Sequence, residues 1–234
     1  MRDNVTRQAF FVTGTDTDAG KTHVCCALLR AAAAAGCSTV GMKPVAAGAS
    51  ETAAGLRNED ALLLQAVSTV QLPYAQLNPV CLPVPVSPHI AARLAGRNVA
   101  VDRLAGLCRG VLAQRAQLTL IEGAGGWRVP LNEREYLSGL AQVLQLPVLL
   151  VVGMRLGCLN HALLSAEAIA RDGLRLAGWV ANCREPALAH YLANRDTLSA
   201  AFGQAPLAEF SCLQSADEQG QIARQALPRL LASC

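Results

Sequence analysis

The sequence predicts an α/β fold: a doubly wound, mostly parallel sheet with helices on both faces, in a single domain spanning residues 1–234. Short apolar stretches alternate along the chain with stretches of helical length, the order in which parallel sheets are built. Hydrophobic residues make up 52% of the chain and charged residues only 16%. This composition is typical of a sheet buried beneath helices and excludes a disordered chain.

Residues 10–22 contain the central motif, an apolar strand followed by a loop between Gly14 and Gly20 and then by Lys21 and Thr22. Such a loop directs backbone N–H groups and the positive end of a helix dipole at one point, where a phosphate can bind. Lys21 would contact the outer phosphates and the Thr22 hydroxyl would bind magnesium. Five residues separate the glycines instead of the common four, so we interpret the motif as a variant P-loop of an NTPase.

The two lysines of the chain, Lys21 and Lys43, stand among 18 arginines. Arginine is a poor substitute for a compact ammonium on a flexible stem, so both positions are candidates for phosphate binding, with chance clustering as the alternative. Lys43 lies near the end of a predicted strand at residues 38–45, where Pro44 prevents a helix. Because ligands bind at the carboxyl ends of parallel strands, Lys43 is expected to face the same crevice as Lys21, unless it is simply solvated.

The first half of the chain contains further predicted helices and loops. A helix at residues 22–35 ends at Gly36, and a loop rich in glycine and alanine covers residues 46–55. A helix begins at residues 58–64, where Asp60 could simply complement the helix dipole. Residues 72–88 are rich in proline, lack periodicity and are expected to lie over the sheet edge. Ser87 is expected to cap a short helix, and His89 belongs either to a pocket wall or to the surface.

The second half begins with an amphipathic helix at residues 101–115 and a strand at 118–122 that ends in Glu122, before a run of glycines. A carboxylate in this position matches the second nucleotide motif of P-loop proteins, which holds magnesium. A buried carboxylate also requires a cationic partner. Further strands are predicted at 147–152 and 176–182, the first followed by a helix entered through residues 153–161. Residues 185–234 are predicted to form a helix, a short segment at 206–210 and a terminal helix.

The composition excludes several classes of partner. The longest apolar run, residues 146–153, is too short to cross a membrane, and the first residues lack the pattern of a signal peptide. We therefore expect a cytoplasmic protein without a membrane partner. The net charge of +3 is too small to indicate nucleic-acid binding.

The ordered set of motifs resembles the dethiobiotin synthetase family, ATP-dependent enzymes of biotin synthesis. The segments that match lie between residue 9 and about residue 183, and they are 14–22, 43–45, 57–60, 87–89, 122–127, 157–161 and 178–182. The resemblance implies a cyclo-ligase that joins CO2 to 7,8-diaminopelargonic acid. In this reaction a carbamate takes the γ-phosphoryl group of ATP, and the neighbouring amine closes the ring and expels phosphate.

The resemblance also implies ATP and Mg²⁺ as cofactors, a homodimer, and roles for individual residues. Lys21, Lys43 and Thr17 would be catalytic, while Thr22, Asp60 and Glu122 would hold magnesium. Asn182 would read the adenine, and Asn160 would hold the substrate carboxylate across the dimer interface. The residues implied to bind ATP are Asp18, Ala19, Gly20, Lys21, Thr22, His23, Asp60, Glu122, Gly123, Ala124, Gly125, Asn182 and Cys183. Those implied to bind the substrate are Thr17, Lys43, Ala47, Gly125 and Asn160.

The chain departs from the family pattern at several positions. Ala47 replaces a serine that bonds the substrate in many members, so that contact is expected to be absent. Asp18 is one methylene shorter than the usual glutamate. Cys183 replaces an aspartate, and residues 210–212 replace an Ile-Pro-Trp-like segment. We expect retained activity with altered affinity for substrate or nucleotide.

Three other functions share parts of this pattern. The first is a nucleotide-switched ATPase of the partition or septum-site type, but residues 15–18 contain no lysine and the last helix is not basic. The second is a ligase for cobalamin precursors, which usually carries an additional glutamine-hydrolysing domain. The third is an inactive nucleotide-binding paralogue, to which Ala47 and Cys183 lend some weight.

Overall fold

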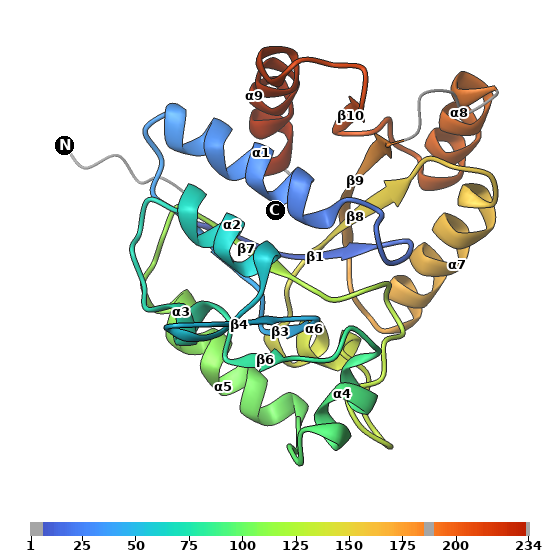
Figure 1. Ribbon diagram of the computed structural model, residues 1–234. Coiled ribbons are helices and arrows are strands. Elements are labelled where there is room, and N and C mark those ends of the chain that lie inside the picture. Colours follow the sequence, from blue (N-terminus) through green and yellow to red (C-terminus); the bar gives the residue numbers. More distant parts are fainter. Residues whose placement is uncertain (1–6, 185–189, 233–234) are drawn as a thin grey trace.

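A six-stranded parallel sheet forms the centre of the protein in the computed structural model, which describes residues 7–184 and 190–232 (Figure 1). The strand order is β10-β9-β8-β1-β7-β2, and every neighbouring pair is parallel. The strands are β1 (Gln8–Gly14), β2 (Thr39–Met42), β7 (Leu118–Glu122), β8 (Val148–Gly153), β9 (Leu176–Cys183) and β10 (Ala208–Ser211). The predicted doubly wound sheet is confirmed.

Helices cover both faces of the sheet because successive side chains of each strand point to opposite sides. Phe10 and Val12 of β1 pack beneath α1 (Lys21–Ala34), α2 (Glu59–Val67) and α9 (Ala216–Ala232). Phe11 faces the opposite cluster, which includes α5 (Val101–Leu112) and α6 (Ser138–Leu144). On that second face α7 (Cys158–Arg171) and α8 (Tyr191–Phe202) cover Leu150 and Trp179. The helix α6 is not among the elements predicted from the sequence.

The chain between β2 and α5 differs most from the prediction. The strand predicted at residues 38–45 is interrupted after Met42, because Pro44 has no N–H with which to continue pairing to β7. The predicted loop at 46–55 instead includes β3 (Val45–Ala47), β4 (Ser50–Thr52) and the start of β5 (Gly55–Arg57). The segment 72–88 contains α3 (Tyr74–Leu77) and β6 (Val80–Leu82), and β6 pairs with β3 in a small parallel sheet.

Most predicted helix ends are confirmed to within a few residues. The helix α1 ends at Ala34, just before Gly36, and the N–H groups of Gly36 and Cys37 donate to the carbonyls of Ala33 and Ala32. The helix α4 (Pro88–Leu94) begins after Ser87 as predicted, but the Ser87 hydroxyl bonds the His89 ring (2.9 Å) and caps no backbone N–H.

Two further predictions concern the helix after β9 and the crossing of a membrane. The helix predicted to start at residue 185 is observed from Tyr191, and residues 185–189 lie outside the described residues. None of the described helices is long and apolar enough to cross a membrane.

Candidate active site

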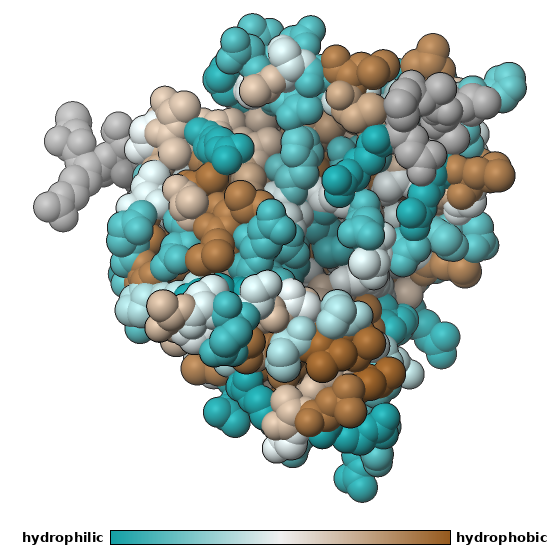
Figure 2. Space-filling view, in the orientation of Figure 1, coloured by the Kyte–Doolittle hydropathy of each residue, from teal (hydrophilic) through white to brown (hydrophobic). Residues whose placement is uncertain are grey.

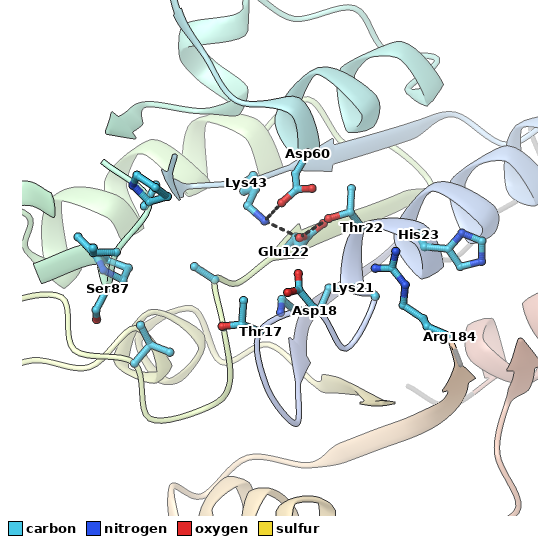
Figure 3. Close-up of a pocket in the computed structure, with 18 residues that line it drawn as sticks. Thr17, Asp18, Lys21, Thr22, His23, Lys43, Asp60, Ser87, Glu122 and Arg184 are labelled. Carbon is cyan, nitrogen blue, oxygen red and sulfur yellow. Dashed lines mark hydrogen bonds and ion pairs between the residues drawn. The ribbon is translucent and has the colours of Figure 1, made fainter. Parts of the chain in front are cut away.

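A cavity of about 500 Å³ opens beside the P-loop at the carboxyl ends of the strands, where ligands of open α/β sheets bind (Figure 3). Its lining comes from the P-loop and the start of α1, from the segments 85–88 and 122–129, and from four single residues: Lys43 after β2, Ala47 in β3, Asp60 in α2 and Arg184 after β9. Figure 2 shows the same face hollowed near its centre, with hydrophilic side chains around the hollow.

The P-loop backbone is arranged to receive an anion. Asp18 and Gly20 adopt left-handed conformations (φ 59° and 89°), and α1 begins directly after Gly20. No side chain of residues 7–184 or 190–232 caps the helix, and its first turn contains no acidic residue. A side chain at Gly14 would come within 3.2 Å of the Lys21 ammonium. The first N–H groups of α1 therefore have no side-chain acceptor, as a phosphate-binding helix start requires.

Lys21 and Lys43 both reach this cavity, as predicted, but their electrostatic surroundings differ. Lys43 is 5% exposed, and its Nζ lies 2.7 Å from Asp60 Oδ2 and 2.6 Å from Glu122 Oε1. Burial lowers the pKa of Lys43, but the two carboxylates outweigh it, so the pKa is raised. Lys21 is 6% exposed and donates to the Asp16 carbonyl at 3.2 Å. Burial, followed by the charge of Lys43, lowers the pKa of Lys21.

Asp60 and Glu122 flank the Lys43 ammonium, and the Thr22 hydroxyl bonds Glu122 beside it. The fully buried Glu122 accepts hydrogen bonds at Oε1 from Lys43 and from Thr22 Oγ1 (2.8 Å). Lys43 is thus the cationic partner that the sequence required for this carboxylate. Burial raises the pKa of Asp60. The charge of Lys43 and hydrogen bonds from Lys43 and Thr22 lower it by more, so the pKa lies below its usual value.

This oxygen cluster fits a magnesium ion. Glu122 Oε2 is buried and has no hydrogen-bond partner among the described residues, so the carboxylate retains an acceptor for a cation. In the described part of the chain no three His, Cys, Asp or Glu side chains converge as a complete metal site. Magnesium does not require one, because it usually takes one or two carboxylates together with water and phosphate oxygens.

A second cavity, of about 550 Å³, extends from the first between α1 and the ends of β9 and β10. Asn182 and Cys183 line it, and Asn182 is 3% exposed and donates from Nδ2 to the Ala19 carbonyl at 2.7 Å. The His23 ring stands edge-on to Phe210, with centroids 5.3 Å apart. Since Thr22, His23, Asp60 and Arg184 line both cavities, one elongated ligand could occupy them together.

Three predicted residues lie outside these two cavities. Ala19 lines a small cavity on the outer side of the P-loop, and Gly123 lies against the Phe11 ring beneath the site. Asn160 is exposed at the start of α7 and lines neither cavity. The other predicted site residues, Ala47 and Thr17 included, line one cavity or both.

Several lining residues were not predicted from the sequence. Arg184 lines both cavities, and Val86 and Val129 form apolar parts of the first. Arg184 could have been found, because it directly follows Asn182 and Cys183 at the carboxyl end of a strand. Val86 could not have been found, because the sequence of residues 72–88 has no periodicity that predicts how it folds. His89 lines a separate cavity and does not line the P-loop cavity. Of the two alternatives left open by the sequence, it therefore belongs to a pocket wall.

Comparison with known proteins identifies close relatives. A family described as "AAA domain" matches residues 8–219. The chain is 62% identical over 178 residues to the ATP-dependent dethiobiotin synthetase BioD of Cellvibrio japonicus (strain Ueda107), covering 76% of this chain and 78% of that protein. It is 58% identical over 191 residues to the protein of the same name from Pseudomonas aeruginosa (strain UCBPP-PA14), covering 82% and 84%. The Vibrio parahaemolyticus protein of that name is 47% identical over 211 residues, covering 89% and 91%.

Solved structures of much lower identity share the fold. The MinC:MinD cell division complex of Aquifex aeolicus aligns with a TM-score of 0.60 at 10% identity, over 96% of both chains. The septum site-determining protein MinD of Pyrococcus horikoshii, complexed with Mg-ADP, aligns with a TM-score of 0.57 at 16% identity, over 97% and 94%. At these identities the likeness concerns the fold alone.

Proposed function

The chain belongs to the ATP-dependent dethiobiotin synthetase family and forms dethiobiotin in biotin biosynthesis, and we propose that it does so as a cyclo-ligase acting on 7,8-diaminopelargonic acid and CO2. One observation carries the proposal at residue level. The P-loop, Lys43 and Glu122 face one cavity in a chain that shares 62% identity with such a synthetase. We further propose that residues 1–234 act as one domain.

The reaction would proceed in three steps. The lone pair of a substrate amine attacks CO2, and loss of a proton to solvent leaves a carbamate. A carbamate oxygen attacks the γ-phosphorus of ATP, and the bond to the ADP oxygen breaks, which gives a carbamic-phosphoric anhydride. The second amine then attacks the carbamate carbon, loses a proton and expels phosphate. Each step needs positioned groups and compensation of negative charge more than it needs a protein nucleophile.

The two lysines would divide the charge compensation between them. Because its pKa is raised, Lys43 remains an ammonium throughout and would stabilise the carbamate and the transferred phosphoryl group. Lys21 has no ion pair among the described residues, so a phosphate would supply the anion that its buried ammonium lacks. Thr17 lines the cavity on the P-loop side and would contact substrate and phosphate there.

We propose that Thr22, Asp60 and Glu122 hold magnesium, which when bound would neutralise charge on the β- and γ-phosphates. Asn182 would contact the adenine in the second cavity. The other residues proposed to bind ATP are those predicted above, with Gly123 acting as support from beneath the site.

The substrate would occupy the part of the first cavity farthest from Asn182. Val86 and Val129 offer apolar surface there for a hydrocarbon chain, and Ala47 offers a methyl group where no hydrogen bond is expected. Asn160 does not line the cavity of its own chain. We therefore propose a homodimer in which Asn160 of one protomer binds the substrate carboxylate in the site of the other.

No second function is favoured. The similarity to septum-site proteins is limited to 10–16% identity and concerns the fold alone. An inactive paralogue is disfavoured because the chain is 62% identical over 178 residues to a named dethiobiotin synthetase and keeps the P-loop and Lys43 beside one cavity.

The proposal is tested by phosphate release from magnesium ATP with bicarbonate, with and without 7,8-diaminopelargonic acid. We expect release that depends on the diamine in the wild type and is lost in Lys43→Ala. Release that is indifferent to the diamine would contradict the ligase assignment. The exposed Arg103 on α5, which lines neither cavity, provides a matched control in Arg103→Ala.

A further inference from the structure

Arg184 occupies a position that the functions assigned above leave unexplained. It directly follows the end of β9, and its exposed side chain lines three cavities around the P-loop. These are the first cavity beside the P-loop, the second cavity beside Asn182, and a small cavity of about 150 Å³ on the outer side of the loop. Arg184 therefore stands where the three cavities meet.

The side chain lies directly over the last residue of the P-loop. Arg184 Cδ would be 3.6 Å from a β-carbon placed on Gly20. Figure 3 shows the side chain extending from the end of β9 toward His23 in the first turn of α1. Because Asn182 bonds the Ala19 carbonyl, the end of β9 is fixed to the P-loop two residues before Arg184. The position of the arginine is thus tied to the loop that it covers.

The guanidinium has no anionic partner within the described residues. Two other arginines are paired, Arg155 with Asp16 at 2.6 Å and Arg128 with Asp172 at 2.7 Å, whereas Arg30 in the lining of the second cavity forms no ion pair with a described residue. No such ion pair or side-chain hydrogen bond joins Arg184 to any described residue. A guanidinium that pairs with no described carboxylate can accept an anion.

We propose that Arg184 binds the α-phosphate of ATP. The inference rests on the proposed nucleotide site. The P-loop lysine serves the β- and γ-phosphates and the base would lie beside Asn182, so the α-phosphate must pass through the junction that Arg184 covers. A guanidinium can donate two parallel hydrogen bonds to a phosphate, which fixes the ribose end of the nucleotide as well as neutralising its charge.

The test compares the binding of ADP, AMP and adenosine to the full chain by competition against a fluorescent ADP analogue. Wild type, Arg184→Ala and Arg184→Lys are compared, with Arg103→Ala as the control for loss of one surface charge. We expect Arg184→Ala to weaken ADP and AMP binding by about 10-fold or more, the range of a charged hydrogen bond, and to leave adenosine binding unchanged. Arg184→Lys should recover part of the loss. In steady-state assays the KM for ATP should rise more than kcat falls.

Three outcomes would overturn the inference alone. The first is wild-type affinity for ADP in Arg184→Ala, and the second is an equal loss for adenosine, which would place the guanidinium on the nucleoside. The third is weaker binding of ADP without weaker binding of AMP, which would show that Arg184 does not bind the α-phosphate. A wild-type protein that binds none of the three ligands would overturn the proposed nucleotide site, and this inference with it.

Discussion

Lys43 Nζ and Glu122 Oε1 lie 2.6 Å apart, and the Glu122 side chain is fully buried. The pair joins the ends of β2 and β7, which are neighbours in the sheet. The two residues are 79 positions apart in the sequence. Removing one of two buried opposite charges leaves the other without a partner, which is costly even where the pair itself adds little stability. The lysine proposed to be catalytic and the folding of the sheet edge are therefore linked.

Removing Lys43 should destabilise the protein as well as inactivate it. In Lys43→Met we expect a loss of about 3–5 kcal/mol in the free energy of unfolding, because Glu122 is left buried without its cation. The double variant Lys43→Met/Glu122→Gln should recover much of that loss while remaining inactive. Urea unfolding monitored by circular dichroism measures both. Equal stability of the single and double variants would contradict the coupling.

Removing Lys21 should have the opposite effect on stability. Because burial and the charge of Lys43 lower its pKa, the ammonium of Lys21 opposes folding at neutral pH, and this cost diminishes as pH rises through the lowered pKa. Lys21→Met should raise the unfolding free energy of the nucleotide-free protein by about 0.5–2 kcal/mol and abolish ATP binding. Thermal unfolding with and without ATP tests both statements. A less stable variant would refute the first.

Asp60 should contribute to the loss of stability in acid. Its pKa is lowered below 3.8, so its contribution is complete above that pH and is lost as pH falls through the lowered pKa. The effect should be modest because the side chain is 42% exposed. Unfolding free energies measured between pH 3 and pH 7 should fall less steeply for Asp60→Asn than for wild type. Parallel curves for the two proteins would exclude a role for Asp60.

Magnesium dependence should follow the oxygen cluster. Thr22→Val keeps the shape of the side chain but removes the hydroxyl that bonds Glu122. We expect this variant to need about 10-fold more Mg²⁺ for half-maximal phosphate release, and chelation to abolish the activity of wild type. The Arg103→Ala variant should titrate like wild type. An unchanged magnesium requirement in Thr22→Val would argue against the proposed ligand set.

The proposed dimer makes a specific prediction for mixed protomers. Lys43→Ala and Asn160→Ala should each be impaired alone, since every site lacks one residue. After dissociation and reassembly of an equal mixture, about a quarter of the sites should be intact, because a mixed dimer restores one of its two sites. Phosphate release at low diamine concentration measures the recovery. No recovery, despite mixed dimers detected by mass spectrometry, would place Asn160 outside the partner's site.

The sequence alone was sufficient for the order of the main elements and the core of the candidate site. The strand that ends in Glu122 was predicted with its observed bounds, and α1 to within one residue, because strand and helix periodicity depends on neighbouring residues. The convergence of Lys21, Lys43 and Glu122 followed from the rule that the carboxyl ends of parallel strands meet at one edge.

Only the tertiary structure decided which of these groups are paired. The ion pairs of Lys43 with Asp60 and Glu122 join residues 17 and 79 positions apart, and no local pattern specifies such contacts. The same holds for β3 and β6, whose pairing gives regular structure to segments that lack periodicity. It also holds for Arg184, which lies over Gly20 only because β9 returns to the P-loop. Local preferences fix where elements begin and end, whereas the partners of buried charges depend on how distant elements pack.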